Sequence, residues 1–218
     1  ININKFSFNT QVSVNLTDKL LESLDIKSVL DYIDEHNIGN PVYLKLLYYA
    51  MICNLNIEDD DSYKIYRELL YAKMDNLKRD EAHSILHFLE SICAQKINSG
   101  RHEFYKDLFE TYELELAKNL INAKVDTPLT VMKFRNIYLT AMRAGKFDWA
   151  EKFINDYKNE LHEENKKNIV ELALAQLNFE KGEYGKTLQH LHKIKTDQVF
   201  FKVDVKVLNL MAFYELGH

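Results

Sequence analysis

Four glycines divide most of this 218-residue chain into segments of similar length. Gly100, Gly145, Gly182 and Gly217 are 45, 37 and 35 residues apart, and each follows a run in which apolar residues recur with helical spacing. A glycine after a helix permits the left-handed backbone that ends it. Two helices in each segment, at periods of roughly 34 to 45 residues, are typical of helical repeats, because a single hairpin cannot bury its apolar face alone.

The composition agrees with a helical chain. Only 6 glycines and 2 prolines are present, too few turn residues for a many-stranded sandwich or barrel. A content of 46% apolar and 28% charged residues argues against disorder, and the net charge of −5 argues against nucleic acid as the main partner. No apolar run reaches the length of a membrane span. We therefore expect an all-α fold, an α-solenoid (superhelix) of about 10–11 helices.

Capping residues indicate where individual helices begin. Asn40-Pro41 and Thr127-Pro128 each place a capping side chain before a proline, which needs no N–H in the first turn of a helix. The acidic run 59–61 precedes an apolar stripe of Ile65, Leu69 and Ala72, where a helix dipole favours acids. We predict helices near 17–24, 27–36, 41–56, 61–75, 79–98, 102–121, 128–144, 147–160, 164–181, 184–194 and 199–216. Alternating apolar residues predict an extended lead-in over 1–16.

Two stretches resemble the tetratricopeptide repeat (TPR) family. They are AGKFDWA at 144–150 and KGEYGKT at 181–187, and the shared pattern is a glycine, an aromatic residue two positions later and a small residue three positions after that. The glycine turns the chain, the aromatic ring packs in the hairpin, and the small residue lets the two helices lie close. The resemblance is clearest over 129–217. We expect one continuous solenoid domain, with divergent helical hairpins over 17–128 and TPR-like repeats over 129–218.

The resemblance implies a right-handed α-solenoid, in which the first helix of each pair lines a concave surface on which a protein or peptide binds. Judged by their spacing from the turn glycines, the residues expected to face this surface are His87, Glu90, Arg135, Leu139, Arg143, Gln176 and Glu180. The alternative is that these side chains only keep the surface hydrated.

The residues that most often carry chemistry favour structural roles in this chain. Cys53 and Cys93 occupy matching places in two hairpins, where a small apolar residue permits close helix packing. His83, His87 and Glu90 share one helix face, but no fourth ligand and no HExxH order accompany them, so we predict no metal site and no cofactor. No nucleophile, phosphate-loop or zinc-protease motif is present, so we predict no catalytic residues and no enzyme.

These patterns predict a non-enzymatic scaffold that binds a protein or peptide. The first residue is Ile rather than Met, which indicates a processed product or an excised piece. The alternative function is therefore the sensor or dimerisation region of a larger regulator, and an enzyme with a polar pocket between hairpins is a third. The two cysteines favour a cytoplasmic location, with secretion as the alternative. No oligomeric state is predicted.

Overall fold

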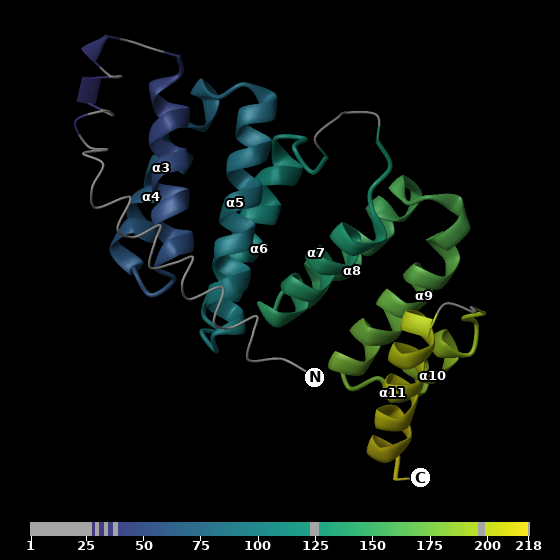
Figure 1. Cartoon of the computed structure of the whole chain (residues 1–218). Coiled ribbons are helices and arrows are strands. Elements are labelled where there is room, and N and C mark those ends of the chain that lie inside the picture. The colour runs from purple at the N-terminus through teal and green to yellow at the C-terminus, as the bar shows by residue number, and fades with distance from the viewer. Residues whose placement is uncertain are drawn as a thin grey trace, which may run out of the picture. The chain divides into compact units, whose positions relative to one another are not determined.

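The computed structural model is helical throughout the part of the chain it describes, which comprises residues 39–122, 127–195 and 199–217 together with Ser28, Asp31, Tyr32, Glu35 and His36. Nine α-helices and two short 3-10 helices are defined there (Figure 1). The all-α prediction is confirmed for these residues. The expected lead-in over 1–16 and the helix expected at 17–24 lie outside them, as does most of the helix expected at 27–36.

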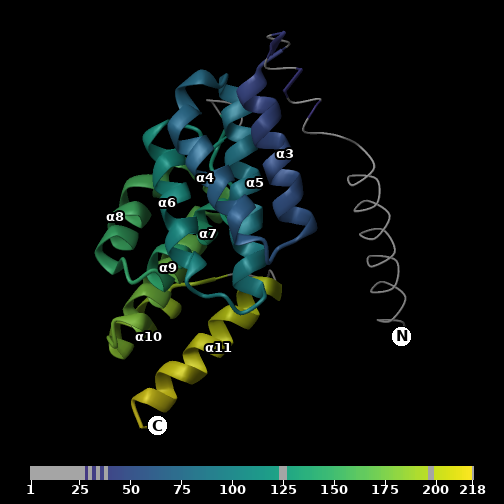
Figure 2. The same cartoon turned by 90° about the vertical axis from the view of Figure 1, so that its left-hand side faces the viewer.

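The chain divides into two compact units, residues 1–102 and 103–218. The change from divergent to TPR-like hairpins that the sequence suggested near residue 129, within one expected domain, lies inside the second unit. The first unit contains α3 (Pro41–Leu55), α4 (Asp60–Lys73), the 3-10 helix η1 (Met74–Asn76) and α5 (Arg79–Asn98). Helix α3 packs against both α4 and α5, as both views show (Figure 1, Figure 2).

The second unit contains α6 (Phe104–Ala117), α7 (Val131–Arg143), α8 (Phe147–Tyr157), the 3-10 helix η2 (Lys158–Glu160), α9 (Glu163–Glu180), α10 (Tyr184–Leu191) and α11 (Val199–Glu215). Helices α7 and α8 form one hairpin, and α9 and α10 form the next. In addition α6 contacts α7, α8 contacts α9, and α10 contacts α11. Sequence-adjacent helices therefore pack in pairs, as expected.

The turn glycines end the helices as predicted. Gly145 and Gly182 have φ angles of +74° and +75°, a left-handed backbone that glycine adopts without a steric penalty. The amide of Lys146, directly after the first of these glycines, donates to the carbonyl of Ala141 at 2.8 Å. This bond satisfies a carbonyl that the end of α7 would otherwise leave without a partner.

Two of the predicted helix starts are confirmed by their caps. The side chain of Asn40 accepts a hydrogen bond from the Tyr43 amide, with Pro41 as the first residue of α3. Asp59 caps α4 by accepting from the amide of Ser62 at 2.9 Å, and this bond lowers the pKa of the Asp59 carboxyl. Both side chains supply an acceptor to a first-turn amide that has no partner within its helix.

The helix start predicted at Thr127-Pro128 is wrong. Helix α7 begins at Val131, and Thr130 is the residue that caps it. Leu129 is extended instead, because its amide donates to the carbonyl of Glu160 at 2.8 Å and it forms an isolated parallel bridge with Leu161. Both leucines are almost completely buried, so this backbone contact closes a small apolar cluster.

The apolar stripe predicted on α4 is also wrong. Ile65 is 44% exposed, and Leu69 and Ala72 are not buried either. The face of α4 that is buried carries two tyrosines and Leu70. Tyr66 fits the core because its ring buries more apolar surface than an isoleucine and its hydroxyl donates to the carbonyl of Ile85 at 2.7 Å.

The two cysteines lie in the core of the first unit, as their structural interpretation predicted. Cys53 and Cys93 are both free thiols with no exposed surface. Burial raises the pKa of the Cys53 thiol to about 11. None of the described helices combines the length and the apolar character that crossing a bilayer requires.

Candidate functional site

Four of the seven predicted partner-facing residues line one groove of the second unit. This α7–α9–α11 groove has a volume of about 220 Å³. Its lining consists of Leu139, Met142 and Arg143 from α7, Gln176, Phe179 and Glu180 from α9, and Asp204, Val207, Leu208 and Met211 from α11. The floor is apolar, and the four charged or amide side chains are distributed among the three helices.

The lining residues of the three helices stand at equivalent positions when they are counted from the turn glycines. Leu139, Gln176 and Met211 each stand six residues before a left-handed glycine, and Arg143 and Glu180 each stand two residues before one. Equivalent positions on successive helices therefore reach the same groove. The same spacing could have identified Met211, which the sequence analysis did not select.

A hydrogen bond from the buried Tyr138 holds the side chain of Gln176 in place. The hydroxyl of Tyr138 lies 2.6 Å from Oε1 of Gln176 and donates to it. Tyr138 is fully buried, and this burial raises the pKa of its phenol above the ordinary value. Because the phenol stays protonated, it keeps donating, and the amide nitrogen of Gln176 is the group left to meet a ligand.

Two ion pairs shape the groove differently. Arg135 Nη2 lies 2.9 Å from Asp204 Oδ2, and both side chains are mostly buried, so this pair ties α7 to α11. Arg135 is not part of the lining and acts on the groove through Asp204. Arg143 and Glu180 are 3.8 Å apart at the rim and are 59% and 38% exposed. A loose, solvated pair of this kind contributes little to stability and can exchange its partner for a ligand's charge.

The two remaining predicted residues lie in the first unit and do not form a joint site. His87 is exposed and lines a separate depression between α3 and α5, together with Met51, Asn54 and Phe88 among others. Glu90 is only 9% exposed. Across the described residues, no group of three or more His, Cys, Asp or Glu side chains is placed to hold a metal ion.

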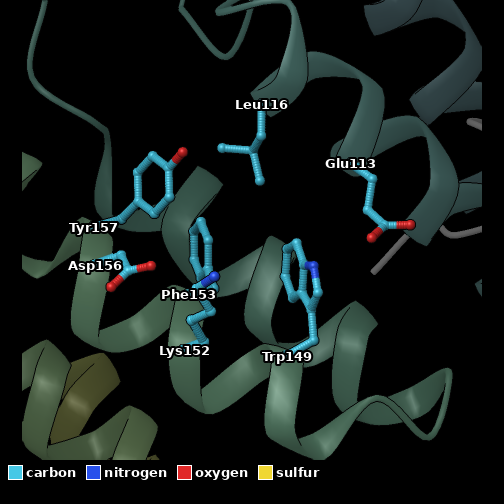
Figure 3. Close-up of a pocket in the computed structure, with 7 residues that line it drawn as sticks. All are labelled: Glu113, Leu116, Trp149, Lys152, Phe153, Asp156 and Tyr157. Carbon is cyan, nitrogen blue, oxygen red and sulfur yellow. The ribbon is translucent and has the colours of Figure 1, made fainter.

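A further hollow, between α6 and α8, was not anticipated. Trp149, Phe153 and Tyr157 stand in a row along α8, with Leu116 of α6 facing them (Figure 3). Ring centroids are 5.5 Å apart for the first pair and 4.9 Å for the second, with interplanar angles of 4° and 23°. Because the rings face one another, their electron-rich faces are already in use, and the row serves chiefly as packing. The spacing of four residues was the signal available in the sequence.

A buried carboxylate links α6 to α7. Glu115 is 1% exposed, and its Oε2 lies 2.7 Å from Nζ of Lys133. The same ammonium group sits 4.8 Å from the centroid of the Tyr112 ring. Burial of a charge is tolerated only when such partners surround it, so these residues fix the α6–α7 contact rather than present a reactive group.

The lining of the α7–α9–α11 groove carries two carboxylates, Glu180 and Asp204, and one guanidinium, that of Arg143, and contains no serine, cysteine, histidine or lysine. It offers an apolar floor, one amide and three charged side chains. Comparisons of the chain with protein-family models, with curated proteins and with solved structures found no match.

Proposed function

We propose that this protein is a non-enzymatic α-solenoid of TPR-like hairpins, which binds a segment of another protein, or a peptide, in the α7–α9–α11 groove. The observation that carries the proposal is that residues chosen by their spacing from the turn glycines, on two successive first helices, line the same groove. A shared surface of this kind is what stacked hairpins produce.

The helix contacts support the stacking part of the proposal. Helix α7 contacts both its own partner α8 and the next first helix α9, and α9 in turn contacts α10 and α11. Both α7 and α9 thus touch the second helix of their own hairpin and the first helix that follows. This is the neighbour pattern expected when hairpins add in sequence order.

The size and lining of the groove support a peptide as the occupant. A volume of about 220 Å³ is smaller than the roughly 300–1,000 Å³ of sites that enclose a small molecule or cofactor. It suits one or two apolar side chains of a longer segment, anchored between Leu139, Phe179 and Met211. The amide of Gln176 and the rim charges of Arg143 and Glu180 would then meet the polar groups of that segment.

Peptide selection tests the proposal. A random peptide library displayed on phage is selected against the folded chain, and binding of the selected peptides is measured by fluorescence anisotropy. Leu139→Lys places a charge on the apolar floor and should weaken binding at least about tenfold, because burying an uncompensated charge is costly. Met132→Lys is the matched control, since Met132 is on the same helix, is 56% exposed and does not line the groove. Equal binding by both variants would place the peptide elsewhere.

A further inference from the structure

Helix α11 carries a concentration of exposed apolar side chains that its packing in the second unit does not explain. Val203, Val207, Leu210 and Tyr214 are 55%, 52%, 72% and 77% exposed, and of these Val207 also lines the edge of the α7–α9–α11 groove. Their spacings of four, three and four residues place them on one side of the helix, and we refer to them as the α11 stripe. Phe213, at 44% exposure, widens it. The opposite side of α11 is buried through Phe201, Leu208 and Ala212.

Comparison with the two preceding first helices indicates what kind of element fits this face. Leu210 stands seven residues before a turn glycine, as do Tyr138 in α7 and Ala175 in α9. Tyr138 and Ala175 are fully buried, and the carbonyl of Ala175 accepts a hydrogen bond from Thr187 of the covering helix α10. A helix therefore covers this position in α9, whereas in α11 it faces solvent.

The geometry points to a second copy of this chain as the occupant: we propose that two copies pair through their α11 stripes. A repeat of four and three residues is the spacing by which two helices pack side chains into one another along a seam. In an antiparallel pair whose two-fold axis crosses between Leu208 and Asn209, Val203 lies opposite Tyr214 of the second copy and Val207 opposite Leu210. Every stripe residue then meets another stripe residue, so the surface is complementary to itself.

The flanking charges permit this pairing. Within α11 the only charged residues are Lys202, Asp204, Lys206 and Glu215. In the antiparallel pair Lys206 comes near Phe213 of the second copy, where its stem covers the ring, and Asp204 stays on the side where Arg135 holds it. Like charges do not face one another across the seam, so the pairing carries no electrostatic penalty.

The available area sets an upper limit on the size of the interface. A fully buried aromatic side chain contributes roughly 150–250 Å². With the exposed fractions given above, the whole apolar face of α11 offers on the order of 600 Å² per copy, or roughly 1,200 Å² in total, which is the lower end of specific interfaces. A dimer that dissociates in the micromolar range, rather than an obligate one, is therefore expected. Pairing of this kind would suit the dimerisation role left as an alternative function.

Sedimentation equilibrium over a wide range of protein concentrations tests the proposal. The 218-residue chain should show a reversible monomer–dimer equilibrium. Leu210→Glu and Tyr214→Glu should each raise the dimer dissociation constant at least about tenfold, because each copy would bury a charge in the seam. Met132→Glu, a substitution at a similarly exposed apolar residue of α7, should leave it unchanged. Because all three side chains are exposed, far-ultraviolet circular dichroism should show unchanged folding.

Two results would overturn the pairing. A chain that stays monomeric at the highest concentrations would mean that the α11 stripe serves another partner, and a dimer that persists in both α11 variants would place the interface elsewhere. The groove variant Leu139→Lys, in contrast, should dimerise normally. Failure of the peptide-binding proposal and failure of the dimer proposal can therefore be told apart.

Discussion

Nζ of Lys96 lies 2.8 Å from Oδ1 of Asp60, although the Lys96 side chain is completely buried. The same ammonium group donates to the carbonyl of Ile57 and sits 5.3 Å from the centroid of the Tyr63 ring. Arg101 donates to both carboxylate oxygens of Asp60, with one hydrogen bond of 2.8 Å to Oδ1 and one of 2.7 Å to Oδ2. The C-terminal end of α5 and the loop after it are thereby fastened to the start of α4.

Removing the Asp60 carboxylate alone should destabilise the first unit more than removing the Asp60 carboxylate and the Lys96 ammonium group together. Asp60→Ala leaves the Lys96 ammonium buried without its counter-charge, and we expect a loss of about 2–4 kcal/mol, somewhat below a fully buried pair because Asp60 is half exposed. Adding Lys96→Met, which keeps the apolar stem, should recover part of that loss. Urea unfolding of the two single variants and the double variant gives the coupling energy. Strictly additive losses would mean that the two groups do not stabilise each other.

Acid should weaken this contact in a defined direction. Hydrogen bonds from Arg101 and Lys96 hold the pKa of Asp60 well below its usual range. A lowered folded-state pKa stabilises the protein fully above the unfolded value of about 3.9, and this contribution is lost as the pH falls from there toward the folded value. The stability difference between the wild type and Asp60→Asn should therefore be constant from pH 7 to about 5 and shrink below about 4. A difference that grows on acidification would contradict this assignment.

The two native thiols should resist modification. Burial raises the pKa of Cys53 to about 11, so at pH 8 only roughly one molecule in a thousand carries the reactive thiolate there, and Cys93 has no exposed surface. We expect slow reaction with Ellman's reagent in the native protein and rapid reaction of two thiols in urea. A Met132→Cys variant supplies an exposed thiol as an internal comparison. Fast labelling of either native cysteine would show that the core of the first unit opens readily.

Two glycines three residues apart should respond to alanine with opposite signs. Gly182 has φ of +75°, so Gly182→Ala should cost about 1–2 kcal/mol of backbone strain, although no atom would crowd the added methyl group. Gly185 lies inside α10, where a methyl group also meets open space. Gly185→Ala should therefore stabilise the chain by about 0.5–1 kcal/mol, because alanine favours a helix interior. Thermal unfolding of both variants decides the matter, and shifts of the same sign would contradict the assigned turn.

Exchanging the two charges of the ion pair between α7 and α11 should restore the stability that either single substitution removes. Arg135→Asp and Asp204→Arg each place like charges together in a mostly buried contact, and we expect each to cost about 1–3 kcal/mol. The double variant should recover at least half of the summed loss. Unfolding in urea measures all four proteins. If the double variant is no better than the single ones, the pair does not determine how α11 sits on α7.

The ends of helices could be predicted well from the sequence where one residue, a capping side chain or a glycine, satisfies the backbone at that end. Asn40, Asp59 and the turn glycines each satisfy the end of a helix locally, so no tertiary information was needed. Thr127-Pro128 misled because the pairing of Leu129 with Leu161 depends on a segment more than thirty residues away. Such a contact leaves no mark in the local pattern.

Burial was harder to predict than helix position. On α4 the expected stripe included Ile65, which is exposed, whereas Tyr66 is buried because the carbonyl of Ile85 provides the acceptor that its hydroxyl needs. Lys96 is buried for the same reason, since its partners come from the preceding helix and loop. In the groove, repeat spacing predicted Leu139 and Gln176, and the same spacing from Gly217 points to Met211 as well.

The bridge between Leu129 and Leu161 brings together the points at which the α7–α8 hairpin begins and finishes. With its two ends joined, this hairpin is a closed module whose internal geometry does not depend on the length of the segment leading into it. Evolution or a protein engineer could lengthen that segment, or duplicate the module whole, without disturbing the helices it contains.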